Sequence, residues 1–463
     1  MKRKVVLLSD IRGVPGDPIV YLPLSIMAVA TVLQRHGVEA VVLDAQVEPD
    51  WRDLLRAHLR DAALFGVSAL TGPSLFVAVE GAGIARQHAP GVPIVWGGYH
   101  ATQAYRSIFE EGLADYVIRG PGEDAVVALL GLLEATPAPA VSIDRLATVP
   151  NVVYRDGSDV RVNPLRMLSS MDDVPPMNYR LVDVSRYLVG PPRYLQYVSS
   201  YGCPHACTFC AEPTQSQRVW RGFGAGRFVD EVLALWNEYR PDRIYLVDPN
   251  FSSSPKRVIA IVRTMQARQV HVPMFCDMRA GDVLRLTREM DLKELRDVGF
   301  DEVFVGLESG SDRMLKLLRK NLVAADGLEA CRLLDAAGIR ACTSFIHDLP
   351  GETPEDSERT LELSAELCRL AGNTQSHHFY TPYPATELYE QLRRDGPVSE
   401  RPTQLDWART STFHGSDVWP GRMSFRRTVL RRLLQLHRQY PARLPKSNLP
   451  VLRPLRVPGM PVA

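Results

Sequence analysis

The chain has 463 residues, of which 45% are hydrophobic and 23% charged, and this balance predicts a globular protein of two or three domains. Its formal net charge of +1 argues against a general binder of nucleic acids or acidic surfaces, because such ligands attract strongly basic proteins. Seven cysteines, three of them in one loop, are too few and too unevenly placed for a disulfide framework and favour a reducing compartment.

The apolar segments near the N-terminus do not predict export or membrane insertion. Residues 5–8 follow a basic start, but they are too few for a signal peptide and continue as a strand. Residues 21–33 are interrupted by Pro23 and are shorter than a bilayer requires. We therefore expect a soluble, cytoplasmic protein with neither a membrane nor a nucleic acid as its partner.

Residues 1–135 alternate between strand and helix patterns. Short apolar runs, typical of buried parallel strands, are separated by segments with helical periodicity. The alternation predicts an α/β domain with a doubly wound, Rossmann-like sheet that binds ligands at the carboxyl ends of its strands. The expected strands cover residues 5–8, 40–43, 64–68, 94–96 and 115–118, and the expected helices include residues 24–36, 51–60 and 73–88.

Three loops at these predicted strand ends contain glycine and small polar residues. Glycine lets the backbone approach a bound nucleotide or ring closely, although it also serves ordinary tight turns. The loops cover residues 68–72, 97–102 and 119–123, and their candidate ligand-binding residues are Ser68, Thr71, Gly97, Gly98, His100 and Gly122.

Residues 136–190 are expected to connect two domains. The segment 136–140 has the composition of a linker. Residues 151–154 and 160–163, on either side of a turn at Asp156 and Gly157, predict a small hairpin.

A loop with three cysteines follows the apolar run at residues 194–198, which predicts a buried strand. Cys203, Cys207 and Cys210 have C-x₃-C-x₂-C spacing, so a short loop can turn their thiolates toward a soft metal. Three thiolates can hold three irons of a [4Fe–4S] cube and leave the fourth iron open. On the loop alone, zinc with His205 as a fourth ligand and a disulfide with one free thiol are alternatives.

Residues 191–395 repeat the strand–helix pattern about six times, which predicts a barrel or partial barrel of parallel strands. The chemistry of such barrels gathers where the strands end. After the cysteine loop, the expected strands cover residues 243–247, 273–276, 302–307, 342–346 and 376–380.

Polar residues follow the second and third of these strands. Asp248 and Asn250 are placed to accept hydrogen bonds from a ligand or to cap the next helix. Arg279 has the guanidinium geometry that suits a carboxylate, unless it forms a structural ion pair with Asp277 or Glu308.

The later strand ends also carry candidates for chemistry. Glu308 ends the fourth strand, where a carboxylate can bind both hydroxyls of a ribose. His347 and Asp348 end the fifth strand, and two titratable groups there are costly to desolvate unless they are used or paired. They are an acid–base pair near a substrate, or they pair with each other or face solvent. His377 and His378, on the sixth strand, cannot both face inward because alternate side chains point to opposite faces.

The cysteine spacing directly after a strand closely resembles the radical S-adenosylmethionine (SAM) superfamily, and the later segments resemble it in the same order. The resemblance implies a partial (β/α)₆ barrel, a [4Fe–4S] cluster on Cys203, Cys207 and Cys210, and SAM on the open iron, and it removes zinc as a serious alternative. An external one-electron donor such as flavodoxin or ferredoxin would reduce the cluster, which cleaves SAM to a 5′-deoxyadenosyl radical. The implied SAM-binding residues are Phe209, Asp248, Asn250, Arg279, Glu308 and Ser309, although Asp248 and Asn250 stand where the family often has a Gly-Gly-Glu-like element.

The three loops of residues 1–135, taken as an ordered set before this motif, resemble the B12-binding domain that precedes many radical SAM cores. The region contains no Asp-x-His-x-x-Gly segment, the pattern expected when a histidine ligates cobalt. Cobalamin would therefore bind without such a histidine, or the domain has kept the fold and lost the cofactor.

Residues 396–463 are expected to form a basic helix, at residues 423–437, and a proline-rich extended end. This end either wraps the core, covers the mouth of the barrel, or is a solvated tail.

Two reactions fit this layout. The favoured one is radical dehydration of a 1,2-diol in an aminoglycoside precursor such as paromamine, with His347, Asp348 and Tyr201 as the candidate acid–base residues. It rests on a resemblance to aminoglycoside diol-dehydratases, which combine this layout with a short C-terminal region. The alternative is a cobalamin-dependent radical SAM C-methyltransferase of secondary metabolism. A non-catalytic protein with a degenerate fold is disfavoured by the intact cysteine set.

Overall fold

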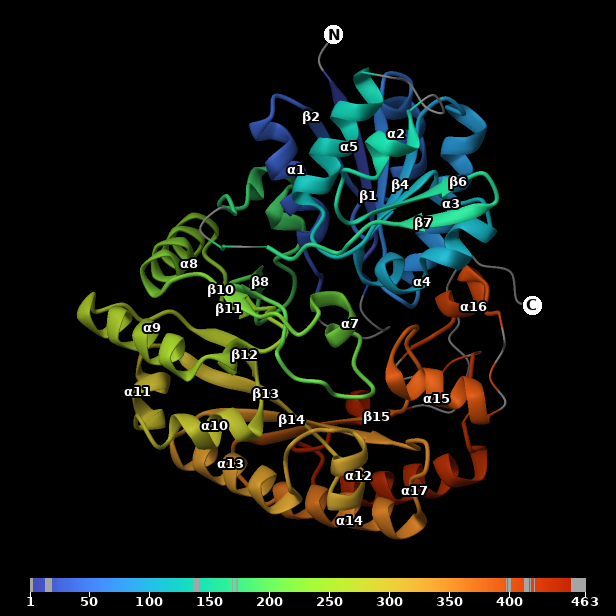
Figure 1. Cartoon of the computed structure of the whole chain (residues 1–463). Coiled ribbons are helices and arrows are strands. Elements are labelled where there is room, and N and C mark those ends of the chain that lie inside the picture. The colour runs from blue at the N-terminus through green and yellow to red at the C-terminus, as the bar shows by residue number, and fades with distance from the viewer. Residues whose placement is uncertain are drawn as a thin grey trace. The chain divides into compact units, whose positions relative to one another are not determined.

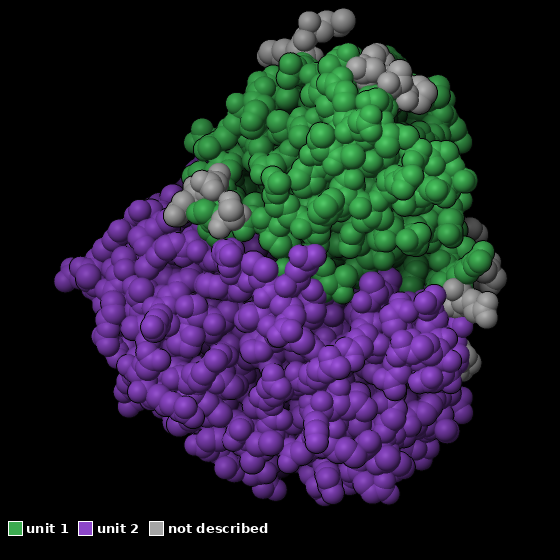
Figure 2. All heavy atoms as spheres, in the orientation of Figure 1, with its two compact units in different colours: residues 1–187, 214–216, 399–410 green, residues 188–213, 217–398, 411–463 purple. Residues whose placement is uncertain are grey.

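The computed structural model describes residues 3–12, 19–135, 141–168, 170–171, 174–396, 398, 401–411, 416, 418–419 and 421–450. The chain divides into two compact units, shown in different colours in Figure 2. Unit 1 comprises residues 1–187, 214–216 and 399–410, and unit 2 comprises residues 188–213, 217–398 and 411–463. The predicted linker at 136–140 and the proline-rich end beyond residue 450 lie outside the described residues.

Unit 1 is built on a sheet whose described strands have the order β2-β1-β3-β4-β5-β6-β7 (Figure 1). The first five pair in parallel, as the sequence predicts, because each apolar run is followed by a helix that returns the chain to the same edge. Its elements are β1 (Lys4–Ser9), α1 (Leu24–Arg35), β2 (Glu39–Asp44), α2 (Trp51–Leu59), β3 (Leu64–Ser68), α3 (Ser74–His88), β4 (Ile94–Gly97), α4 (Gly98–Glu110), β5 (Tyr116–Ile118), α5 (Glu123–Ala135), α6 (Ile143–Leu146), β6 (Val152–Asp156), β7 (Asp159–Val162) and α16 (Gln404–Ala408).

The expected hairpin forms, but it belongs to the sheet of unit 1. Strand β6 pairs antiparallel with β5, and β7 then pairs antiparallel with β6. Val152, Val153 and Tyr154 are buried, so the hairpin contributes to the core of this unit and extends its sheet by two strands.

Unit 2 contains a parallel sheet whose described strands have the order β15-β14-β13-β12-β11-β8, so strands that are neighbours in the sheet follow one another along the chain. The sheet is open between β15 and β8, as a partial barrel requires. Its strands are β8 (Tyr194–Tyr197), β11 (Arg243–Leu246), β12 (Met274–Met278), β13 (Phe300–Glu308), β14 (Arg340–His347) and β15 (Asn373–Phe379), and a separate pair is formed by β9 (Ser200–Tyr201) and β10 (Arg221–Gly222).

Helices cover one face of this sheet (Figure 1), because successive crossovers of the same hand place each helix on the same side. The α-helices that lie between β10 and β15 in the chain are α8 (Ala225–Tyr239), α9 (Pro255–Ala267), α10 (Ala280–Leu286), α11 (Leu292–Asp297), α12 (Asp312–Leu317), α13 (Ala324–Ala336) and α14 (Pro354–Leu367). Two helices, α15 (Glu387–Asp395) and α17 (Met423–Gln439), follow the last strand, and α7 (Glu212–Ser216) is divided between the two units.

The two faces of the sheet in unit 2 differ in burial. Side chains such as Leu246, Cys276 and Val303 are fully buried, as expected beneath helices, whereas Tyr245 and Asp277 are only partly buried. We call the partly buried side the inner face. Across β11 to β15 it carries Arg243, Tyr245, Phe275, Asp277, Glu302, Phe304, Gly306, Cys342, Ser344, Ile346, Thr374, Ser376 and His378.

The expected basic helix of the tail is α17, and the described chain from residue 421 packs on unit 2, whereas α16 belongs to unit 1. Val429 and Leu433 of α17 join Leu361 of α14 and Phe379 of β15 in one apolar cluster. The chain then runs along β15, where the backbone N–H of Gln375 donates to the carbonyl of residue 443 at 2.8 Å. The tail thereby pairs with an edge strand that would otherwise expose its hydrogen-bonding groups.

Among the described residues, none of the helices combines the length and apolar character needed to cross a bilayer.

Candidate functional site

The cysteine loop begins where β9 ends at Tyr201, the candidate acid–base residue nearest the loop. Gly202 has a φ of 79°, a left-handed conformation that glycine adopts readily, and it turns the chain into the loop. Thr208 anchors the loop, because its N–H donates to the carbonyl of Leu318 at 3.1 Å and its carbonyl accepts from the N–H of Leu388 at 2.9 Å. The loop is therefore fixed to segments that follow β13 and β15.

The loop cysteines are free thiols whose sulfurs accept N–H groups. Arg279 Nη1 lies 3.3 Å from Cys207 Sγ, and the backbone N–H of Glu212 donates to Cys210 Sγ at 3.4 Å. Burial raises the pKa of Cys203, and it raises the pKa of Cys210 to about 12, so both are neutral thiols at pH 7. Iron would replace these protons, and the N–H donors would stabilise the resulting thiolate charge.

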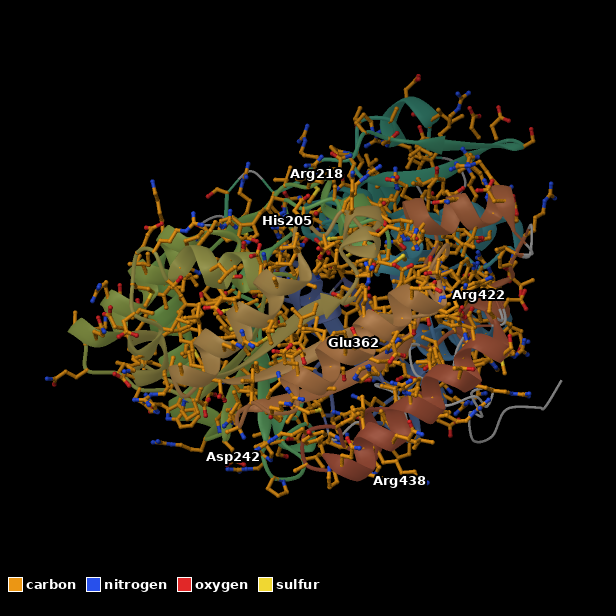
Figure 3. The ribbon with its side chains drawn as sticks, turned by 90° about the horizontal axis from the view of Figure 1, so that it is seen from below. His205, Arg218, Asp242, Glu362, Arg422 and Arg438 are labelled. Atoms are coloured by element: carbon orange, nitrogen blue, oxygen red, sulfur yellow. The ribbon has the colours of Figure 1, made fainter. Side chains whose placement is uncertain are left out.

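The arrangement of donors also bears on which metal group fits. No three His, Cys, Asp or Glu side chains within the described ranges converge as a single metal ion requires. An iron–sulfur cube makes a different demand, because each thiolate binds a different iron. His205, labelled in Figure 3, lies in the same loop, and its Nε2 is buried without a hydrogen-bond partner among the described residues. Three free thiols in one anchored loop, with N–H donors on two sulfurs, fit the predicted cube.

Arg279 lies beside the cysteine loop. Besides Cys207 Sγ, its guanidinium contacts the backbone carbonyl of Lys320. No ion pair joins it to Asp277 or Glu308 in the described part of the chain, so the structural alternative considered for this arginine is not formed. Pairing of Arg279 with the SAM carboxylate remains a prediction.

Glu308 is paired with a residue that the sequence did not single out. Its Oε1 accepts a hydrogen bond from Lys320 Nζ at 2.7 Å, and both side chains are buried. Lys320 Nζ also lies 5.9 Å from the centroid of the Phe209 ring, so the pair lies next to the cysteine loop. Gly306 makes room for it, because a Cβ there would collide with the Glu308 carboxylate. Lys320 sits in a turn without local periodicity, and nothing in the sequence signals its burial.

Asp248 fastens the strand that leads into the cysteine loop. Its carboxylate accepts hydrogen bonds from the backbone N–H groups of Ser199 (2.6 Å) and Ser200 (3.1 Å) and from their hydroxyls (2.6 and 2.7 Å). These four hydrogen bonds to a buried carboxylate position the strand that leads into the cysteine loop. If Asp248 also accepts a hydrogen bond from SAM, its oxygens must accept that bond in addition to those from the two serines.

Asn250 and Ser309 are likewise engaged with protein partners. Asn250 Nδ2 donates to Asp282 at 2.8 Å, and Asn250 Oδ1 accepts from the hydroxyl of Ser252 at 2.8 Å. The hydroxyl of Ser309 lies 3.1 Å from that of Thr360 on α14. Contacts of Asn250 and Ser309 with SAM remain predictions, because the hydrogen bonds seen here join these residues only to other protein groups.

His347 lies on the helix-covered side of the sheet. Its Nε2 is 2.9 Å from Nδ1 of His377, and the two rings are stacked with centroids 5.2 Å apart. His377 in turn lies 3.3 Å from the hydroxyl of Ser364 on α14. Burial lowers the pKa of His347 to about 3, so the ring is neutral. The prediction that His377 and His378 face opposite sides is confirmed, since His378 lies on the inner face.

Asp348 is held by the C-terminal helix. Its carboxylate accepts from Arg422 Nε at 2.7 Å and from Arg426 Nε at 2.6 Å, and Asp348 is fully buried. Arg422, at the start of α17, and Arg438, near its end, are labelled in Figure 3. His347 and Asp348 therefore neither pair with each other nor face solvent; each is buried and has its own partners away from the inner face. This geometry gives no support to an acid–base role.

The inner face carries polar residues that the sequence interpretation assigned no chemistry. His378 Nε2 lies 2.9 Å from the hydroxyl of Ser376 on the same strand. Asp277 was expected in the loop after the third strand, but β12 continues through Met278, so Asp277 is a strand residue. The sequence signal that could have drawn attention to Asp277 is an acidic residue within an otherwise apolar strand.

In unit 1, the loops predicted to bind a ligand come together at the ends of β3 and β4. Thr71 Oγ1 lies 2.9 Å from His100 Nδ1, and His100 Nε2 lies 2.7 Å from Gln404 Oε1. Trp407, also on α16, presents its ring to His100 with centroids 6.2 Å apart. Burial lowers the pKa of His100 to about 4, so the ring is neutral and both of its nitrogens are engaged.

The positions occupied by glycine in these loops differ in whether a larger residue would fit there. Gly98, directly after Gly97 at the end of β4, has a φ of 89°, and a Cβ there would lie 2.8 Å from the hydroxyl of Ser68. Gly122 has no such need, because a Cβ there would make ordinary contacts. The left-handed glycine of that loop is Gly120, with a φ of 66°. The close approach of backbones therefore depends on Gly98, whose added Cβ would lie 3.0 Å from the carbonyl of Ala69, whereas Gly120 is required for its left-handed φ.

Two protein families match the chain. The B12 binding domain matches residues 19–130, which fall in unit 1, and the Radical SAM superfamily matches residues 197–364, which include the cysteine loop and the strands β11 to β14.

Similar curated proteins have different activities. The chain is 27% identical over 387 residues to an uncharacterized methyltransferase, PH0819, of Pyrococcus horikoshii, covering 83% of this chain and 80% of that protein. It is 28% identical over 362 residues to the anaerobic magnesium-protoporphyrin IX monomethyl ester cyclase of Cereibacter sphaeroides, covering 76% of this chain and 57% of that protein.

Two solved structures share the fold across both units. The radical SAM methyltransferase TsrM from Kitasatospora setae, with cobalamin and a [4Fe–4S] cluster bound, has a TM-score of 0.73 at 18% identity and covers 98% of this chain and 94% of its own. The cobalamin-dependent SAM radical enzyme OxsB, with aqua-cobalamin and SAM bound, has a TM-score of 0.67 at 21% identity. The match covers 85% of this chain but only 55% of the OxsB chain, so this chain spans about half the length of that enzyme.

Proposed function

We propose that this chain, which carries a B12-binding domain followed by a radical SAM domain, is a cobalamin-dependent radical SAM enzyme that methylates a carbon atom of a small molecule. The observation that carries the proposal is the cysteine loop inside the matched radical SAM segment, with Arg279 against Cys207 Sγ and the Glu308–Lys320 pair beside Phe209. A radical SAM domain uses a [4Fe–4S] cluster and SAM.

Methyl transfer takes the place of dehydration as the preferred reaction. Methyltransferases occur among both the similar curated proteins and the similar structures. The residues expected to serve dehydration, His347 and Asp348, contact His377 and the arginines of α17 on the helix-covered side. The aminoglycoside substrate likewise has no support from the comparisons. Because a cyclase is also among the similar proteins, the test must separate methyl transfer from other radical reactions.

The residues of unit 2 would hold and shield the reacting groups. When bound, the cluster supplies the electron that cleaves SAM, and cobalamin supplies the methyl group. Cys203, Cys207 and Cys210 would hold the cluster. Arg279 would stabilise the charge on the Cys207 thiolate, and Phe209 would cover the loop with an apolar ring that excludes water.

Unit 1 would bind cobalamin through the loops at residues 68–72, 97–102 and 119–123. His100 would not ligate cobalt, because Thr71 and Gln404 engage its two ring nitrogens. This agrees with the missing Asp-x-His-x-x-Gly segment, so we propose binding without a histidine ligand from this motif.

The test is an anaerobic assay of protein purified from cells supplied with cobalamin, with flavodoxin as the electron donor and CD₃-labelled SAM. Stoichiometric corrin absorption, with both S-adenosylhomocysteine and 5′-deoxyadenosine as products, supports the proposal. Cleavage to 5′-deoxyadenosine alone, in protein free of corrin, favours dehydration or another radical reaction. Absence of 5′-deoxyadenosine removes the radical SAM activity altogether.

The matched variants are Cys203→Ala and Cys331→Ala. Both cysteines are free thiols, but Cys331 is buried in α13, away from the loop. The first variant should lose cluster absorption and 5′-deoxyadenosine together, and the second should retain both.

A further inference from the structure

The inner face of unit 2 contains a carboxylate without a partner. Asp277 Oδ1 is buried and has no hydrogen-bond partner among the described residues, and no ion pair to Asp277 is present there. Glu302, one inner-face row below, is by contrast bonded to Arg243 at 2.8 Å and to Arg340 at 2.6 Å. A buried carboxylate oxygen without a partner is costly, so its retention in a strand points to a partner that arrives from outside.

Two aromatic residues are neighbours of Asp277 on the inner face. In the pairing of β12 with β13, Phe304 lies directly opposite Asp277. Phe275, two residues earlier, lies on the same face, and its ring centroid is 4.7 Å from that of Tyr245. An aromatic face and a carboxylate both attract a positively charged nitrogen, one through its ring quadrupole and the other through its charge.

A second carboxylate, that of Asp248, acts on Asp277 with the sign that favours a bound cation. Burial and the neighbouring carboxylate of Asp248 raise the pKa of Asp277 to about 7, so the apo protein relieves this charge by taking up a proton. A bound ammonium group would instead restore the carboxylate.

The position of Asp277 fits a substrate site. Arg279 directly follows the end of β12 with an extended backbone, and its guanidinium reaches Cys207 Sγ at 3.3 Å. Two residues of extended chain span about 7 Å, so the backbone of Asp277 lies about one such step from that of Arg279, whose side chain touches the proposed cluster loop.

We propose that Asp277, with the rings of Phe304 and Phe275, binds an ammonium group of the substrate, so that the substrate class is an amine. The inference rests on the proposed function, because that function makes the inner face the site of the acceptor. The α-ammonium group of SAM has the same chemistry and is the alternative source that the experiment must separate.

The experiment measures binding to the cluster-reconstituted protein with two probes, benzylamine, protonated at pH 8, and S-adenosylhomocysteine, which carries the α-ammonium group of SAM. Benzyl alcohol is the neutral control. We expect the wild type to bind benzylammonium more tightly than benzyl alcohol, and Asp277→Asn to bind benzylammonium about tenfold more weakly, because a charge-assisted contact is lost. S-Adenosylhomocysteine should bind equally to both proteins.

The control variant is Glu302→Gln, which alters a carboxylate on the same face that already has arginine partners. It should retain benzylammonium binding. Phe304→Leu is a second test that keeps the carboxylate, and it should weaken benzylammonium binding several-fold through loss of the ring.

Equal benzylammonium binding by wild type, Asp277→Asn and Phe304→Leu would overturn the inference. Loss of S-adenosylhomocysteine binding in Asp277→Asn would assign the carboxylate to SAM and overturn it as well. Failure of the proposed function is seen separately, as absence of 5′-deoxyadenosine from the wild type.

Discussion

The ammonium group of Lys320 lies 2.7 Å from the carboxylate of Glu308, and both side chains are buried beside the ring of Phe209. A resemblance to known enzymes assigns Glu308 to the ribose of SAM, yet in the structure this carboxylate already has a cation. The pair links the end of β13 to the cysteine loop, so its loss should affect both stability and SAM binding.

Replacing Lys320 with methionine should destabilise the protein by about 3–5 kcal/mol, because it leaves the buried Glu308 carboxylate unpaired. It should also weaken binding of S-adenosylhomocysteine. Chemical unfolding measures the first effect, and calorimetric titration of the reconstituted protein measures the second. Lys316→Met changes an exposed lysine on α12 and should alter stability by less than about 0.5 kcal/mol. Equal stability of the two variants would show that the buried pair contributes little.

Asp348 is predicted to stabilise the fold rather than to transfer protons. Asp348→Asn would leave Arg426 buried with a weaker partner, and we expect a loss of about 3–5 kcal/mol in chemical unfolding. The matched control is Glu358→Gln, which breaks the half-exposed pair between α14 and Arg432 of α17 and should cost at most about 1 kcal/mol. A stable Asp348→Asn variant with impaired product formation would instead restore the acid–base hypothesis.

Stability of unit 2 should fall with acidification because of its buried histidines. Burial lowers the pKa of His347 to about 3 and lowers that of His377, so both stay neutral in the fold. Below about pH 6.5 these histidines bind protons in the unfolded chain but stay unprotonated in the folded state. Each histidine therefore removes about 1.4 kcal/mol per pH unit between pH 6.5 and its folded-state pKa.

This pH dependence is measured by urea unfolding between pH 7.5 and 4.5. His377→Gln should make the decline shallower, whereas the matched variant His271→Gln, at an exposed histidine, should leave it steep. An identical pH profile for wild type and His377→Gln would contradict the prediction.

Gln404 should hold α16 in unit 1 through the imidazole of His100. Gln404→Leu removes the partner of His100 Nε2 and one of the two hydrogen bonds of the Ser107 hydroxyl, which keeps its bond to the carbonyl of Ala104. The expected cost of about 1–3 kcal/mol should accelerate hydrogen exchange of the α16 amides roughly tenfold or more. Leu405→Ala, at an exposed position of the same helix, is the control and should leave exchange nearly unchanged. Unchanged exchange in Gln404→Leu would mean that other contacts hold this helix.

The fold could be predicted largely from the sequence because its signals are local. Short apolar runs alternating with helical periodicity specify parallel strands and crossovers, and three cysteines within eight residues specify a soft-metal loop. The alternation of side chains along a strand likewise predicted that His377 and His378 face opposite sides.

Which face each strand presents inward depends on the side where the helices pack, and no local pattern contains that information. The structure places His378 and Asp277 on the inner face and His347 beneath α14. The acid–base role predicted for His347 at the end of β14 therefore loses its support.

Ion pairing was also decided only by the tertiary structure. The partner of Glu308 is twelve residues away in a turn, and the partners of Asp348 follow it by 74 and 78 residues. Burial makes such carboxylates depend on a cation, but only the packing of distant segments determines which cation reaches them. The sequence by itself thus determined the two α/β folds and the cysteine loop, whereas the tertiary structure decided which polar groups are already paired and which are left for a ligand.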